Sequence, residues 1–135
     1  MINMEEQIRY ISDELLQKGN LDVIETGFTH DYKAHAEGKL FTGHEFIIKF
    51  TKQLRTAITN IKVTDIQVFA TTENTITHQR KLEGIHTGNM MGIPASGNKV
   101  VWYEMLVTRF EGDKIAEDWL LSTLAGELLL KQSKK

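Results

Sequence analysis

The sequence contains no cysteine and only one proline. The lack of cysteine excludes disulfide bonds, thiolate zinc sites and cysteine nucleophiles, and it favours a cytoplasmic protein. No stretch approaches the roughly 18 apolar residues of a membrane-spanning helix, and the acidic, amphipathic N-terminal segment differs from a secretory leader. We therefore expect neither membrane insertion nor a leader.

Neither sign of charge predominates, because the sequence has 16 Lys and Arg residues and 18 Asp and Glu residues, which gives a net charge of −2. Nucleic-acid binders carry clustered positive charge, so we expect no nucleic-acid partner. A chain of 135 residues with 41% hydrophobic residues can bury a core without a metal or disulfide. The simplest organisation is one domain over residues 1–135.

Apolar side chains recur at helical spacing in three segments of the first sixty residues. Each segment begins at a residue that suits a helix N-cap. Asn3 with Glu6 begins the first, which Gly19 ends, Asn20 begins the second, and Thr42 with Glu45 begins the third as a capping box. The pattern predicts three helices, of which the third extends to about residue 58.

After Asn60 the period changes to two and β-branched residues become frequent, which predicts strands over 61–70, 75–87, 99–110 and 114–122. The first of these shifts phase near Thr64 and Asp65, as a β-bulge would require. Helices followed by consecutive strands indicate an α+β domain, with a curved antiparallel sheet covered by helices on one face.

The strand over 75–87 places titratable groups among aliphatic ones on one face. This row comprises Ile76, His78, Arg80, Leu82, Gly84 and His86. Such groups are seldom buried unless they are paired or line a wet cavity, so the row predicts a pocket. The glycines around His86 favour an imidazole that faces a ligand, or a hydrogen-bonded wall residue. His78 fits a structural role better.

Strict alternation along 114–122 places Glu117, Trp119 and, beyond the strand, Thr123 on one face with aliphatic neighbours. A carboxylate in apolar surroundings has a raised pKa and can serve as a general acid or base. Two alternatives stay open: Glu117 forms an ion pair with Arg80 or Arg109, or the other face of the strand is the inner one.

Local spacing provides no metal motif, since no two histidines stand at i and i+4 on a predicted helix. His78 and His86 would lie about 26 Å apart on a regular strand at about 3.3 Å per residue. His30 and His44 fall at a loop and a helix start, where we expect surface residues. There is also no phosphate-binding loop, so we expect no metal and no cofactor.

One run of residues and several later positions match the pattern of a known family. The run is His86-Thr87-Gly88-Asn89-Met90-Met91-Gly92-Ile93-Pro94-Ala95-Ser96-Gly97, and the later positions are Arg109, Gly112, Lys114-Ile115, Glu117, Trp119 and Gly126. The sequence thereby resembles the SnoaL-like polyketide cyclases, also called ester cyclases. The resemblance extends weakly over the whole chain.

The resemblance implies the cone-shaped nuclear-transport-factor-two-like fold, in which three helices pack on a curved, mainly antiparallel sheet and enclose a cavity. It also implies an aldol ring closure by acid–base residues without cofactor or metal, and a homodimer that associates through the open sheet. The family pattern has an aspartate four residues after the tryptophan, and here that position is Thr123. A threonine hydroxyl is not basic at neutral pH.

Two main hypotheses follow. In the first, the protein catalyses cofactor-free aldol cyclisation, isomerisation or hydration of an apolar carbonyl compound. His86 or Glu117 is then the base and Arg80 stabilises enolate charge. In the second, favoured by Thr123, the protein only binds an aromatic or lipid-like ligand. The expected ligand contacts are His35, Arg80, Met91, Trp119 and Thr123. A dimer-forming structural domain is a third option.

Overall fold

The computed structural model describes residues 3–132 and contains one six-stranded sheet with helices around it. The elements are, in chain order, α1 (Met4–Ile11), the π-helical segment η1 (Ser12–Gln17), α2 (Asp22–Gly27), β1 (Phe28–Ala36), β2 (Lys39–Thr42), α3 (His44–Ala57), β3 (Ile58–Thr71), β4 (Thr75–His86), β5 (Lys99–Glu111), β6 (Lys114–Ser122) and α4 (Leu124–Leu130). Among these helices none is long and apolar enough to cross a membrane.

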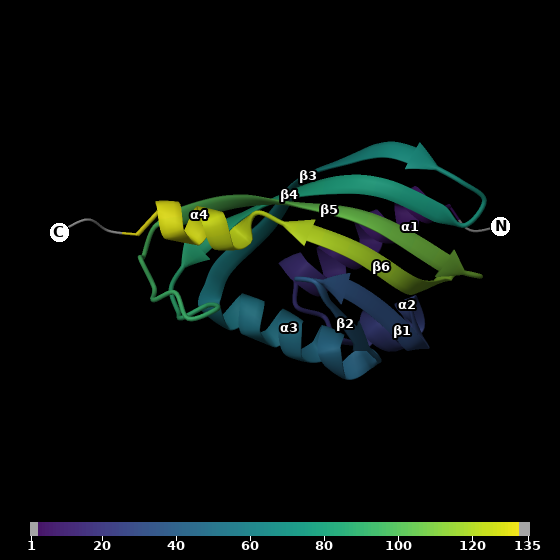
Figure 1. Cartoon of the computed structure of the whole chain (residues 1–135), viewed down its shortest axis with the longest axis horizontal. Coiled ribbons are helices and arrows are strands. Elements are labelled where there is room, and N and C mark those ends of the chain that lie inside the picture. The colour runs from purple at the N-terminus through teal and green to yellow at the C-terminus, as the bar shows by residue number, and fades with distance from the viewer. Residues whose placement is uncertain (1–2, 133–135) are drawn as a thin grey trace.

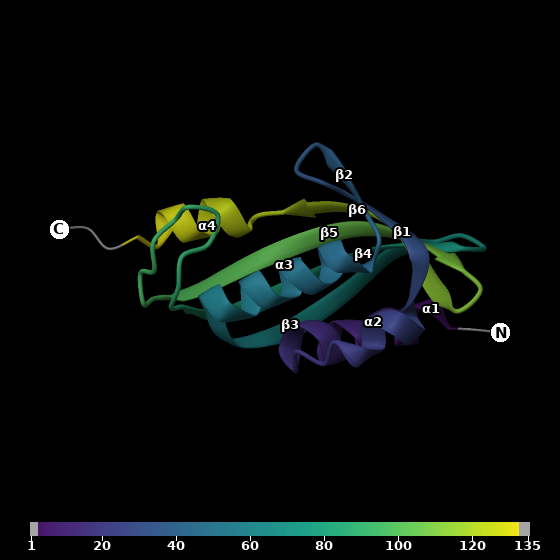
Figure 2. The same ribbon diagram turned by 90° about the horizontal axis from the view of Figure 1, so that it is seen from below.

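The strands are arranged in the order β2-β1-β6-β5-β4-β3. Only β1 and β6 run parallel; the other neighbours pair antiparallel. The sheet curves, and α1, α2 and α3 lie on its inner side, while α4 continues from β6 at one end (Figures 1 and 2). This architecture confirms the predicted α+β class.

The sequence pattern locates most elements and misses the strands β1 and β2 and the helix α4. Asn3 caps α1 as predicted, because its side chain accepts a hydrogen bond of 3.1 Å from the Glu6 amide. The predicted capping box of α3 is wrong: Thr42 pairs with Lys33 in the β1–β2 ladder, and the helix is capped instead by Gly43 with a φ of 83°. Neither β1 nor β2 was expected as a strand.

Buried hydrophobic side chains form two clusters that divide the interior along the length of the sheet. One cluster joins α1, α2 and β1 to the central strands, through residues such as Ile8, Ile24 and Ile76. The other joins the C-terminal end of α3 to β5 and α4, through Leu54, Trp102 and Leu128. The C-terminal segment therefore packs back onto the domain.

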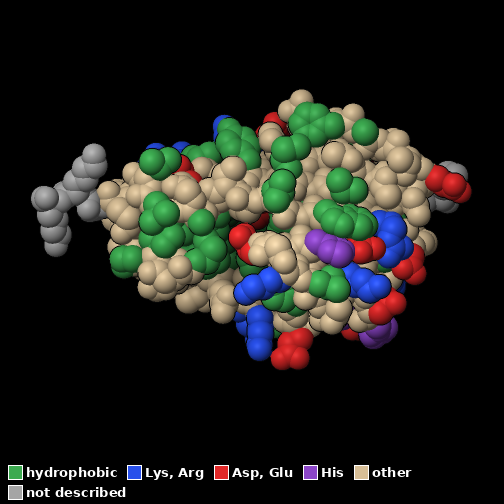
Figure 3. All heavy atoms as spheres, in the orientation of Figure 1, with side chains coloured by type: hydrophobic (Ala, Val, Ile, Leu, Met, Phe, Trp, Pro, Cys, Tyr) green, Lys and Arg blue, Asp and Glu red, His purple; other side chains and the backbone are tan. Residues whose placement is uncertain are grey.

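The outer face of the sheet lacks a helical cover over β5 and β6. Hydrophobic side chains gather there and over α4 (Figure 3). The exposed members on the two strands are Tyr103, Met105, Trp119 and Leu121. Their exposure contrasts with the alternating buried positions of the same strands.

Candidate functional site

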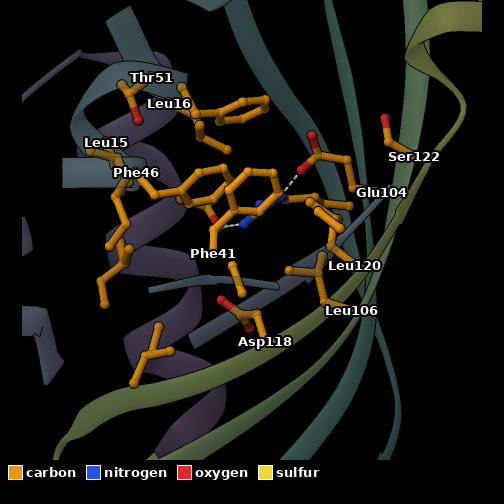
Figure 4. Close-up of a pocket in the computed structure, with 18 of the residues that line it drawn as sticks. Leu15, Leu16, Phe41, Phe46, Thr51, Glu104, Leu106, Asp118, Leu120 and Ser122 are labelled. Carbon is orange, nitrogen blue, oxygen red and sulfur yellow. Dashed lines mark hydrogen bonds and ion pairs between the residues drawn. The ribbon is translucent and has the colours of Figure 1, made fainter. Parts of the chain in front are cut away.

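A cavity of about 630 Å³ lies between the inner face of the sheet and the helices. Its walls are mostly aliphatic and aromatic, and Figure 4 shows Leu15 and Phe46 facing Leu106 and Leu120 across it. Polar groups reach it from both layers, among them Ser12, Tyr32, Thr51, His78, Arg80, Glu104, Thr108, Asp118 and Ser122. A cavity of this size with a few convergent polar groups is typical of a small-molecule site.

Arg80 and Glu104 form a buried ion pair on the cavity wall. The Arg80 Nε donates to Glu104 Oε1 at 2.6 Å, and Arg80 Nη1 donates to Ser12 Oγ at 3.0 Å. The Trp102 indole donates to the second carboxylate oxygen of Glu104 at 3.4 Å. A guanidinium has five N–H donors, so Arg80 is held in place and keeps donors for a ligand.

Ser12 is the first residue of the π-helical segment η1 and lies one turn after Ile8 on the buried face of the preceding helix, so its side chain points toward the sheet. Such π segments recur at functional sites. Ser12 is 1% exposed although it is polar. Its contact with Arg80 satisfies the hydroxyl and fixes the guanidinium from the helix side.

Asp118 is a buried carboxyl group on β6 that also lines the cavity. It accepts hydrogen bonds from the Tyr32 hydroxyl at 2.7 Å and from the Thr108 hydroxyl at 2.5 Å. Burial raises the pKa of Asp118 above its usual range, although these two hydrogen bonds oppose the shift. Burial, together with the Asp118 charge, raises the pKa of Tyr32 well above 10, so the phenol remains a donor.

His78 lies between these groups on β4 and lines the same cavity. Burial and the nearby positive charge of Arg80 lower the pKa of His78 to about 4. The imidazole is therefore neutral at neutral pH. It can exchange hydrogen bonds with a ligand without adding charge to the cavity.

The structure corrects the predicted inner face of β6. Arg109 pairs with Glu117, but the next residue of β5, Phe110, pairs with Ile115. Ala116 is thus an extra residue in a β-bulge, and it shifts the alternation of all later side chains by one position. Ile115 still faces inward, whereas Glu117 faces outward.

Glu117 and Trp119 consequently lie on the outer face and are not among the residues that line the cavity. His35 Nε2 lies 2.6 Å from a Glu117 carboxylate oxygen, and the His35 ring stacks on Trp119 with centroids 5.0 Å apart. The bond to His35, and the one from Arg109, lower the pKa of Glu117. The expectation of a raised pKa at Glu117 is wrong. Both alternatives describe this residue, since it forms an ion pair with Arg109 and the other face of the strand is the inner one from Glu117 onward.

The other predicted site residues have different locations. Arg80 and Met91 line the cavity, the latter at its half-exposed rim. His86 is fully buried in the β4 row but does not line the cavity, and neither ring nitrogen has a hydrogen-bond partner in the described part of the chain. Thr123 is exposed, and its hydroxyl accepts a hydrogen bond from the Tyr103 amide at 2.9 Å.

Sequence reasoning missed Glu104 and Asp118. A signal for Glu104 existed, because an acid interrupts the mostly apolar row Val100, Trp102, Leu106 and Phe110 of the predicted third strand. For Asp118 the alternation along the sequence predicted an outward-facing side chain, because the bulge in β6 is not visible in the sequence. Its partner Tyr32 comes from β1, which lies beside β6 only through the parallel pairing.

The curved sheet, its inner helices and the hollow with buried titratable groups define an α+β cavity protein. The family model of the SnoaL-like polyketide cyclases matches residues 6–129, and the chain belongs to this family. A search of curated proteins finds no match to the chain.

Solved structures show the same fold at low sequence identity. A protein from Jannaschia sp. CCS1 assigned to the SnoaL-like polyketide cyclases is 18% identical, with a TM-score of 0.81 over 97% of this chain and 92% of that one. IdmH from Streptomyces antibioticus, assigned to the polyketide cyclases, is 16% identical, with a TM-score of 0.81 over 96% and 98%. A protein from Catenulispora acidiphila with a ketosteroid isomerase-like fold is 17% identical, with a TM-score of 0.70 over 93% and 91%.

Proposed function

We propose that this protein binds an apolar carbonyl compound in the cavity and transfers a proton next to the carbonyl group. The observation that carries the proposal is the buried Asp118 carboxyl, whose pKa is raised by burial. A raised pKa makes the carboxylate a stronger base, and the protonated group can return the proton, as general acid–base catalysis requires. Asp118 therefore replaces Glu117 as the preferred acid–base residue.

Arg80 supplies the complementary role of stabilising negative charge. Proton removal next to a carbonyl leaves an enolate, and a fixed guanidinium in a low-dielectric cavity stabilises such an oxyanion. The bonds to Glu104 and Ser12 hold Arg80 in position before a substrate binds. Aldol closure, isomerisation and hydration all use this pair of roles.

A second candidate function is binding of an aromatic or lipid-like ligand without chemistry. Thr123 favours it, because the residue at the position of the family's aspartate is exposed and bonded to the Tyr103 backbone. The aromatic side chains of the cavity, such as Phe41 and Phe46, suit a flat ligand.

Exchange of the α-protons of β-tetralone in deuterium oxide, followed by proton NMR, tests the catalytic proposal. We expect the wild-type protein to accelerate exchange, and the Asp118→Asn variant to lose roughly 10²–10⁴-fold, as removal of a general acid–base group does. Asp113→Asn, in the exposed β5–β6 turn, is the matched control and should retain the rate. Saturable binding of β-tetralone without accelerated exchange would support the binding function instead.

We also propose that the protein is a homodimer that associates through the outer face of β5 and β6. Tyr103, Met105, Trp119 and Leu121 expose apolar surface there, with exposed fractions from 38% to 77%. Contiguous apolar patches on a soluble domain mark interaction sites. This surface is separate from the cavity, so assembly and the proposed chemistry can be tested independently.

A further inference from the structure

Two histidines and a glutamate converge at the junction of α2, β1 and α3, outside the cavity. His30 Nε2 lies 3.4 Å from Glu25 Oε1, and His44 Nδ1 lies 3.5 Å from Glu25 Oε2. One ligand atom from each of the three residues falls within 4.8 Å of the other two. None of the three lines the cavity.

His44 is already held in the tautomer that a metal ligand needs. Its Nε2 lies 2.8 Å from the Thr29 carbonyl oxygen and 3.2 Å from the Phe28 carbonyl oxygen. A carbonyl only accepts, so Nε2 carries the hydrogen and, in the neutral ring, Nδ1 has a free lone pair directed toward Glu25. A backbone carbonyl that fixes the second nitrogen is the usual outer partner of a metal-bound histidine.

The distances are also compatible with a shared ion. Ligands at about 2.0–2.2 Å from a tetrahedral ion are roughly 3.3–3.6 Å from each other, and the two glutamate–histidine distances, one to each carboxylate oxygen, lie in this range. A set of one atom from each residue spans up to 4.8 Å, so the three side chains would draw closer together around an ion. The His30 and His44 rings are stacked, with centroids 5.3 Å apart and planes at 15°. His30 must therefore tilt away from the His44 ring to share an ion with it, and its side chain, 81% exposed, can make this rotation at the cost of the stacking contact.

We propose that Glu25, His30 and His44 bind a divalent transition-metal ion of the zinc class. Two imidazoles and one carboxylate form a ligand set that Zn²⁺ uses, with the remaining coordination positions open to solvent. The local spacing rules that gave no metal motif do not apply here, because the three residues come from separate elements. The ion would link α2 and the first turn of α3 to β1, and so brace the wall that carries Tyr32 and Phe46.

Titration of the untagged full-length protein with Zn²⁺ in a calorimeter tests the proposal, since a histidine tag would bind the ion itself. We expect one saturable site per chain, and a melting temperature that rises on the order of 5–10 °C at about one hundred times Kd. The nitrogen splitting of Cu²⁺ bound at the same site, measured by electron paramagnetic resonance, should report imidazole ligands.

His30→Gln and Glu25→Gln remove ligands from exposed side chains and should leave the fold intact. Each should weaken Zn²⁺ binding at least about tenfold, because loss of even an outer partner of a metal ligand costs roughly 10–100-fold in affinity. His35→Gln, on the same strand but at the outer face of the sheet, is the matched control and should bind as the wild type does. Absence of saturable binding, or binding that survives both ligand variants, would overturn the proposal, whatever the outcome of the exchange assay.

Discussion

His78 makes the stability of the fold depend on pH. Its pKa is about 4 in the folded protein, against an ordinary value of 6.5 for histidine. Between these limits the unfolded chain binds a proton that the native state does not, so stability falls as the pH decreases from about 6.5 to about 4, by about 3 kcal/mol in all. Above the upper limit both states are neutral and the contribution is constant.

The His78→Gln variant should therefore show a shallower loss of stability on acidification than the wild type. Urea unfolding at several values between about pH 7 and about pH 4 gives the two slopes, and their difference cancels the titration of all shared groups. Gln79→Asn, the neighbouring position of β4 and not titratable, should keep the wild-type slope. Parallel curves for His78→Gln and the wild type would contradict the assigned pKa.

Asp118 and Glu117 show how far a residue's chemistry depends on which side of a strand it faces. They are adjacent in sequence, yet burial raises the pKa of one while hydrogen bonds from His35 and Arg109 lower that of the other. Sequence reasoning assigned the raised pKa to Glu117, which is the wrong one of these two carboxyl groups. It could not select the residue, because the choice depends on the register of β6 against β5.

At the scale of elements, the register of β6 against β5 explains why the sequence predicted the wrong inner face for β6. The phase shift near Thr64 and Asp65 was predicted, and the structure confirms an irregular register between Val63 and Asp65. That shift is visible in the sequence because it changes where polar and apolar residues fall. In β6 the bulge occurs at two adjacent apolar residues, Ile115 and Ala116, and so leaves no mark in the pattern.

The β3–β4 pair depends on the absence of a side chain at Gly84. A Cβ at this position would lie 2.5 Å from Ile58 Cγ2 and 2.9 Å from the Thr59 carbonyl oxygen. Because backbone cannot move aside cheaply in a paired strand, we expect Gly84→Ala to destabilise the fold by about 1–3 kcal/mol.

Gly126 in α4 supplies the matched control, since a Cβ there meets nothing within 4 Å. Gly126→Ala should stabilise the protein by roughly 0.5–1 kcal/mol, because alanine is the better helix former. Chemical denaturation measures both changes. Equal effects of the two substitutions would show that Gly84 is not a point of close approach.

At the scale of the whole molecule, the helices cover only the inner face of the sheet, and the outer face of β5 and β6 bears the apolar patch. Met105 and Leu121 are cross-strand partners at its centre. Two copies joined through such faces would bury these side chains and leave the cavities on the far sides of the assembly. The arrangement of layers thus favours a dimer in which each chain keeps its own site.

The Leu121→Glu variant should be monomeric, because an unpaired carboxylate in an apolar interface must be desolvated or the interface must open. Sedimentation equilibrium should give about twice the chain mass of 15.4 kDa for the wild type and the chain mass for the variant, with association weakened at least about a hundredfold. Tyr10→Glu, at a similarly exposed apolar position on α1, should leave the wild-type mass unchanged. A wild type that sediments as a monomer would refute the dimer. A Leu121→Glu protein that remains dimeric would show that the interface is on another surface. The next surface to test would then be α4, with its exposed Leu129 and Leu130.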